Sequence, residues 1–186
     1  MKVIQLHKNE KQLILGLREN RREAQKEFYG LYASKMLGVC RQYIKDMQNA
    51  EEVMLNGFLK VFTKIDSYKN KGSFEGWVRR IMINESISFL RLKRNLIFID
   101  DDAYFTEETE MVYEETKEVS QLQKLVDNLR EDLRVVFNLY VVEEYKHKEI
   151  ATVLEITENA SKLRYRRAKE MLQKQYNNLN LKSYEQ

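Results

Sequence analysis

The sequence predicts an all-α fold, with two small helical domains joined by an acidic linker. Three observations favour this class. Proline is absent and all six glycines lie at or before Gly76, so few residues interrupt helices. Apolar residues recur at helical spacing on both sides of an acid-rich tract from Asp100 to Glu118. Basic residues dominate on either side of that tract, from Lys60 to Arg94 and from Lys162 to Lys174.

The order of basic and acidic segments along the chain indicates what kind of partner the protein binds. The net charge of +3 over 186 residues hides a basic–acidic–basic succession. Such an order is typical of two modules that bind a polyanion, because clustered cations attract phosphates. The alternative is that the charged faces only solvate the helices.

Composition excludes several other classes. Hydrophobic residues make up 43% of the chain, which is enough for a core, and charged residues make up 33%. Cys40 is the single cysteine, so no disulfide framework exists and a reducing compartment fits. No apolar run approaches the ~20 residues that span a bilayer, and the N-terminus lacks the apolar segment of a signal peptide. We therefore expect a soluble, cytoplasmic protein.

The first part of the chain reads as a succession of amphipathic helices. Residues 11–19 favour a short first helix, and a second begins near Arg22 with an apolar stripe along one face. The pattern breaks at 46–49, and a third helix is expected from Ala50. Cys40 sits beside the second stripe, where a buried thiol is expected rather than a reactive one. The predicted core positions are Phe28, Tyr32, Met36, Val39 and Tyr43 on the second helix, and Met54, Phe58, Val61 and Ile65 on the third.

The stretch from Ser73 to Asn95 predicts the helix on which the first domain is organised. Ser73 is a typical N-cap residue. Ile83, Ile87 and Leu90 fall on one stripe, which we expect to be buried. A polar stripe runs beside it and can stack on bases, bind their edges and neutralise phosphates. The alternative is an amphipathic helix with a solvated basic side and a core tryptophan. The polar stripe comprises Trp77, Arg80, Asn84, Ser88 and Arg91.

Residues 97–118 are predicted to form a flexible linker. Its carboxylates repel one another and cannot build a core. A calcium-binding loop is the alternative, but the required central glycine is absent and the acids after Asp102 lack the spacing of such a loop.

The second domain is predicted to begin near Val119. One helix is expected around Leu122, Leu125, Val126 and Leu129, and Glu131-Asp132 opens another. In that helix we expect four residues to face inward, namely Leu133, Val136, Phe137 and Tyr140.

A helix-turn-helix is predicted to follow. Residues 148–154 form its short first helix, Glu155-Ile156 turns the chain, and Thr157 caps a last helix that runs past Leu172. On the last helix, Ser161, Tyr165, Ala168 and Leu172 are assigned to packing. The outward face suits a DNA groove, whereas the alternative is a solvated basic helix on a protein-binding bundle. That face comprises Asn159, Lys162, Leu163, Arg166 and Lys169.

Two stretches together resemble the extracytoplasmic-function (ECF) sigma factors, the smallest class of bacterial promoter-recognition subunits. NAEEVMLNGFLKVFTKIDSY followed by GSFEGWVRRIMINESISFLRLKR is similar to sigma region two, and LREDLRVVFNLYVVEEYKHKEIATVLEITENASKLRYRRAKEML to region four. The resemblance implies a three- to four-helix region-two bundle over 1–96, an acidic linker over 97–118, a region-four helix-turn-helix domain over 119–178 and a tail over 179–186.

For region two, the resemblance implies two sets of contacts. The helix from Ala50 to Lys64 would bind the clamp helices of core RNA polymerase, and the helix after Ser73 would hold bases of the −10 promoter element. The family usually has glutamine and glutamate where Leu55 and Asn56 stand. The implied polymerase-binding residues are Glu51, Glu52, Leu55, Asn56, Leu59 and Lys60. The implied −10 residues are Lys69, Lys71, Phe74, Trp77, Arg80, Asn84, Ser88 and Arg91.

For region four, the resemblance implies contact with the −35 duplex, and it further implies regulation by an anti-sigma factor. No catalytic residue, metal or cofactor is expected, since the chain has no HExxH, Walker-type or nucleophile-elbow motif. A free-standing helix-turn-helix regulator that binds DNA without polymerase is the alternative function. The implied −35 residues are His147, Lys148, Asn159, Lys162, Leu163, Arg166 and Arg167.

Overall fold

The computed structural model describes residues 2–97 and 123–184, and all regular structure within these ranges is helical. The prediction of an all-α chain is therefore confirmed. The chain divides into two compact units, Met1–Leu92 and Lys93–Gln186, which we call unit 1 and unit 2. Most of the predicted linker lies outside the described residues, and the predicted domain boundaries stay a prediction.

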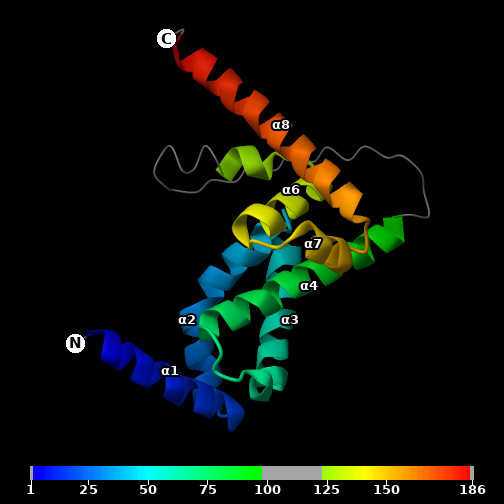
Figure 1. Ribbon diagram of the computed structural model, residues 1–186. Helices are drawn as coiled ribbons and strands as arrows, with labels where there is room; N and C mark the ends of the chain where they lie inside the picture. Colours follow the sequence, from blue (N-terminus) through cyan, green and yellow to red (C-terminus); the bar gives the residue numbers. More distant parts are fainter. Residues whose placement is uncertain (1, 98–122, 185–186) are drawn as a thin grey trace. The chain divides into compact units, whose positions relative to one another are not determined.

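Unit 1 contains α1 (Lys2–Arg18), α2 (Arg22–Arg41), α3 (Met47–Lys64), the 3-10 turn η1 (Ile65–Ser67) and most of α4 (Phe74–Ile97) (Figure 1). Two helices begin earlier than the sequence pattern predicted. α1 extends back to Lys2, because no proline or glycine before Lys11 breaks a helix. α3 begins at Met47, because Asp46 is its N-cap and accepts a hydrogen bond from the Asn49 amide at 2.8 Å.

The core of unit 1 forms around Phe28 on α2. Its ring packs edge-on against Phe58 and Phe62 of α3 and against Phe74 of α4. The three predicted apolar stripes of α2, α3 and α4 face this core, with only Tyr32 half-buried. The predicted core of the first domain is confirmed. Its buried members are Phe28, Met36, Val39, Tyr43, Met54, Phe58, Val61, Ile65, Ile83, Ile87 and Leu90.

Unit 2 contains a helical stretch over 123–127, α6 (Glu131–Phe137), the π-helical segment η2 (Asn138–Val142), α7 (His147–Leu154) and α8 (Glu158–Tyr184) (Figure 1). α7 and α8 form the predicted helix-turn-helix. Glu155 turns the chain with a left-handed backbone, φ 54°, where a side chain is disfavoured. The hydroxyl of Thr157 accepts the Ala160 amide at 3.1 Å, so Thr157 caps α8 as predicted.

One cluster of buried residues in unit 2 joins α6 to α8. Leu129, Leu133 and Ala168 are buried together, with Phe137 and Leu172 packed against them. One predicted core position is wrong, because Tyr140 is 37% exposed. It lies in η2, whose wider turn alters the helical register, and Asn138 and Leu139 are buried in that segment instead.

Candidate protein-binding and DNA-binding surfaces

The predicted polymerase-binding residues lie on one exposed face of α3. All six are exposed, whereas Val53, Met54 and Phe58 between them point into the core. Leu55 and Leu59 stand out, with exposed fractions of 49% and 60%. Apolar side chains on an otherwise charged helix face are typical of a protein-binding site. We call this set the α3 face: Glu51, Glu52, Leu55, Asn56, Leu59 and Lys60.

The predicted base-contacting residues share one face of α4. They follow one another at steps of three or four residues, which keeps them on one side of a helix. Arg80 and Asn84 are exposed, and the other members are half-buried. This α4 face presents an aromatic ring, an amide and cations side by side, as a site for unpaired bases requires. It comprises Trp77, Arg80, Asn84, Ser88 and Arg91.

Phe74, which the resemblance also implied as a −10 contact, is not exposed on the α4 face. Its side chain is fully buried, in ring contact with Phe28, Tyr32 and Tyr68. The Phe74 ring also stacks on Trp77, with centroids 5.8 Å apart and planes 19° apart. The sequence resemblance implied a DNA contact for Phe74, but the structure places it beneath Trp77, where it supports that ring.

The loop between η1 and α4 is held by hydrogen bonds to its own backbone. The Tyr68 hydroxyl donates to the Gly72 carbonyl at 3.0 Å, and the Arg18 guanidinium donates to the Tyr68 carbonyl at 2.9 Å. Gly72 has φ +80°, which a glycine adopts without strain. Ser73 caps α4 as predicted, since its hydroxyl accepts the Gly76 amide at 3.0 Å.

This ordered loop presents two exposed cations beside the start of α4. Lys69 and Lys71 are both exposed, and the Lys69 ammonium donates to the Asp66 carbonyl at 3.2 Å. Arg18 and Tyr68, which fix the loop, were not among the predicted site residues. Burial raises the pKa of the Tyr68 hydroxyl, which keeps it a hydrogen-bond donor.

The outward face of α8 carries the residues predicted to read the −35 duplex. Asn159, Lys162, Leu163, Arg166 and Lys169 are all exposed, and we call them the α8 face. Two of its cations have acidic neighbours on the same helix. Lys162 lies 2.6 Å from Glu158, and Arg166 lies 3.5 Å from Glu170. Such exposed pairs are weak and can give way to phosphates.

Arg167 lies at the edge of the α8 face, because it follows Leu163 by one helical turn, and it is exposed. It also lines an open groove, which Arg130 and Leu133 border from the α6 side and which Glu170, Met171 and Lys174 border on α8.

His147 lies in an aromatic cluster between the two helices of the helix-turn-helix. Its ring stacks on Tyr140, with centroids 4.4 Å apart and planes 13° apart, and Tyr165 lies at 5.8 Å. Its Nδ1 atom is 3.0 Å from the Ser161 hydroxyl. Burial, with a smaller effect from Lys162, lowers the pKa of His147 below its usual value. His147 is thus half-buried and packs α7 onto α8, while Lys148 beside it is exposed.

Metal binding and thiol chemistry have little support in the described part of the chain. Within residues 2–97 and 123–184, no three His, Cys, Asp or Glu side chains come together as a metal site. Cys40 is fully buried, and burial raises the pKa of its thiol to about 11, as expected for a structural cysteine. No helix in these ranges is both long and apolar enough to cross a membrane.

Comparison with known families agrees with the two units. The family described as Sigma-70 region 2 matches residues 28–95, and the family described as Sigma-70, region 4 matches residues 120–172. Together the two matches cover most of the chain, in the order that the sequence pattern predicted.

Several curated relatives match more than two thirds of the chain. The ECF RNA polymerase sigma factor SigW of Bacillus subtilis is 25% identical over 182 residues, covering 91% of this chain and 97% of the relative. The RNA polymerase sigma-H factor of Pseudomonas aeruginosa is 25% identical over 156 residues, covering 77% of this chain and 81% of the relative.

A solved structure shares the fold. The sigma factor RpoE of Bartonella quintana, crystallised with the anti-sigma factor NepR, matches with a TM-score of 0.53 and 18% sequence identity. The match covers 80% of this chain and 94% of that one. With both sigma regions present in order and curated relatives that span both regions, the chain belongs to the sigma-70 family and is an RNA polymerase sigma factor of the ECF class.

Proposed function

We propose that this sigma factor directs core RNA polymerase to its promoters through three surfaces. The α3 face binds the clamp helices of the polymerase, the α4 face captures unpaired bases of the −10 element, and the α8 face docks on the −35 duplex. One observation carries the proposal. Two faces of different chemistry lie on adjacent helices of unit 1: an exposed one with apolar anchors, and a partly exposed one with an aromatic ring and an amide.

The α3 face suits a protein partner better than it suits DNA. Its exposed leucines, Leu55 and Leu59, gain most from burial against another protein. Glu51 and Glu52 at its start would repel phosphates. The polymerase contact is therefore assigned to α3 rather than to α4.

The α4 face suits bases that have left the stack. Trp77 offers a supported aromatic surface, Asn84 an amide for a base edge, and Arg80 a cation for phosphate. Stacking one base on an aromatic ring returns about 1–3 kcal/mol. Opening the duplex costs about 1.4 kcal/mol per base-pair step. One or two captured bases thus offset only a short bubble, and the polymerase must contribute the rest.

The α8 face suits the major groove of duplex DNA. Arg166 and the two lysines can contact guanine edges or phosphates, and each good bidentate base contact discriminates by about 1–3 kcal/mol. Lys148, exposed at the start of α7, and Arg167, at the edge of the α8 face, are assigned to the flanking backbone. We place the half-buried His147 near the DNA, where it acts mainly by packing α7 onto α8.

We also propose a regulatory partner and a cellular location for this chain. RpoE of Bartonella quintana has the same fold and was crystallised with an anti-sigma factor. We assign a partner of this kind to the present chain as well. Since the polymerase and its promoters are in the cytoplasm, the chain acts there. It acts as an initiation factor, not as an enzyme.

The decisive experiment is transcription in vitro with core RNA polymerase and a random promoter library. We expect the purified chain to co-elute with core polymerase and to select promoters with two separated sequence elements. Leu59→Asp should abolish co-elution, whereas Lys124→Ala in unit 2 should not. A chain that binds DNA specifically but never joins polymerase would be a free-standing regulator, and the proposal would be overturned.

A further inference from the structure

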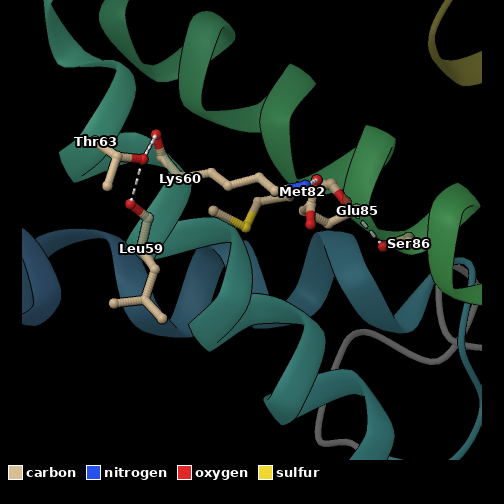
Figure 2. Close-up of polar contacts among 6 residues, drawn as sticks. All are labelled: Leu59, Lys60, Thr63, Met82, Glu85 and Ser86. Carbon is tan, nitrogen blue, oxygen red and sulfur yellow. Dashed lines mark hydrogen bonds and ion pairs between the residues drawn. The ribbon is translucent and has the colours of Figure 1, made fainter.

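One ion pair joins the two helices that carry the α3 face and the α4 face. The ammonium of Lys60 on α3 lies 2.6 Å from a carboxylate oxygen of Glu85 on α4, as Figure 2 shows. The Glu85 side chain is only 13% exposed, whereas that of Lys60 is 47% exposed. The carboxylate is largely withdrawn from water, so its charge depends on Lys60 for compensation.

This pair lies one helical turn from a tight contact between α3 and α4 at Gly57 and Met82. Gly57 precedes Lys60 by three residues, and Met82 precedes Glu85 by three. A Cβ atom on Gly57 would lie 2.5 Å from the Met82 sulfur and 3.8 Å from Cγ of Glu85. The Glu85 side chain lies within ordinary contact distance of position 57, and from there it reaches Lys60 on the next turn of α3. Figure 2 shows Lys60, Met82 and Glu85 together.

Each member of the pair borders a different surface. Lys60 is the last residue of the α3 face, and Glu85 directly follows Asn84 of the α4 face. An α-helix is stiff over a single turn, so Asn84 and Glu85 move together when α4 rotates about its axis. Rotation of α4 would separate Glu85 from Lys60. The ion pair thus adds to the packing of Met82, Ile83 and Ile87 in setting the direction in which Asn84 points, relative to α3.

We propose that Glu85 is a positioning residue for promoter opening, which holds Asn84 in the orientation for base capture while α3 is docked on polymerase. The inference rests on the proposed function of the two faces. It requires no contact of Glu85 with DNA or with polymerase. Loss of Glu85 should therefore slow opening and leave polymerase binding unchanged.

The chain offers a matched control on the same helix. Glu75 of α4 pairs with Lys35 of α2, also at 2.6 Å, but its side chain is 42% exposed. Glu75 is nine residues before Asn84, which places it on the opposite side of α4. An effect of losing any interhelical ion pair would appear in Glu75→Ala as well, whereas an effect of positioning would not.

The test uses the full chain, saturating core polymerase and a promoter selected from the random library. Opening is followed by the fluorescence of 2-aminopurine in the non-template strand of the −10 element. We expect Glu85→Ala to slow opening about threefold to tenfold. We expect its affinity for polymerase to stay within about twofold of the original chain, and Glu75→Ala to change neither quantity. If Glu85→Ala melts too early to assay, Glu85→Gln keeps the shape and removes only the charge.

A charge exchange separates positioning from a general structural role. Lys60→Glu sets two carboxylates against each other and should slow opening. Because Lys60 also belongs to the α3 face, the affinity of each Lys60 variant for polymerase is measured first, and its opening rate is taken at a polymerase concentration that saturates that variant. Adding Glu85→Lys restores the pair with reversed polarity and should return opening to within about twofold of the original rate.

Three results would overturn the inference. They are opening by Glu85→Ala at the original rate, a double variant no faster than the slower single variant, and opening rates that simply follow melting temperature across all variants. Failure of the original chain to bind polymerase would instead overturn the proposed function, so the two failures are distinguishable.

Discussion

Gly57 of α3 lies so close to Met82 of α4 that a Cβ atom at position 57 would fall 2.5 Å from the methionine sulfur. Met82 is itself fully buried, so its flexible side chain has little space in which to retreat. The contact sets the distance between the helix with the α3 face and the helix with the α4 face.

Gly57→Ala should therefore destabilise unit 1. Overpacking a core costs about 1–3 kcal/mol, while alanine gains about 1 kcal/mol over glycine in a helix, so a net loss of about 1 kcal/mol is expected. Gly38→Ala is the control, because no atom lies within 4 Å of its added Cβ and it should gain about 0.5–1 kcal/mol. Urea unfolding followed by Trp77 fluorescence measures both. Equal effects of the two substitutions would contradict the close contact.

Asn84→Ala should impair promoter opening without loss of polymerase binding. Asn84 is exposed on α4, so its removal should change the free energy of unfolding by no more than about 0.5 kcal/mol. Permanganate reactivity of −10 thymines reports opening, and co-elution reports polymerase binding. A parallel loss of opening, binding and stability would make Asn84 structural.

Arg166→Ala should weaken binding of the −35 duplex and reduce the salt dependence of that binding. A cation that neutralises one phosphate contributes about one unit to the slope of log affinity against log salt. Fluorescence anisotropy at several salt concentrations gives the slope for the full chain. Lys124→Ala, an exposed cation of unit 2 outside the helix-turn-helix, is the control and should leave it unchanged. An unaltered slope and promoter preference for Arg166→Ala would remove Arg166 from the interface.

Unit 2 should lose stability on mild acidification through His147. The pKa of His147 is lowered in the folded chain, so the unfolded chain binds the proton first as the pH falls below about 6.5. The neutral ring therefore stabilises the fold above that pH, and this contribution is lost as the pH falls from about 6.5 through the lowered folded pKa.

Hydrogen exchange of α7 and α8 between about pH 7.5 and pH 5.5, corrected for intrinsic exchange rates, measures this effect. His147→Phe keeps an aromatic ring against Tyr140 and cannot be protonated, so its protection should change less over the same range. Equal pH dependence in the two proteins would assign the effect to another group.

Local patterns were sufficient to predict much of this chain. Ser73 and Thr157 cap helices through amides three residues away, as their sequence context predicted. The apolar stripes of α2, α3 and α4 are buried, and the polar residues of the α8 face are exposed, because helical periodicity is set by neighbours in sequence.

Such local patterns do not predict contacts between residues that are far apart in the sequence. The burial of Phe74 depends on rings from α2, and the exposure of Tyr140 depends on the π-helical turn that precedes α7.

The sequence by itself determined which residues form helices, where most of these helices begin and which face of each is apolar. Only the tertiary structure decided which side chains meet across helices. Lys60 and Glu85 are 25 residues apart in the chain, and Arg18 and Tyr68 are 50 apart. Their contacts depend on how closely the helices approach and how each is rotated about its axis. Both properties are set by the packing of the whole unit, and not by any single stretch of sequence.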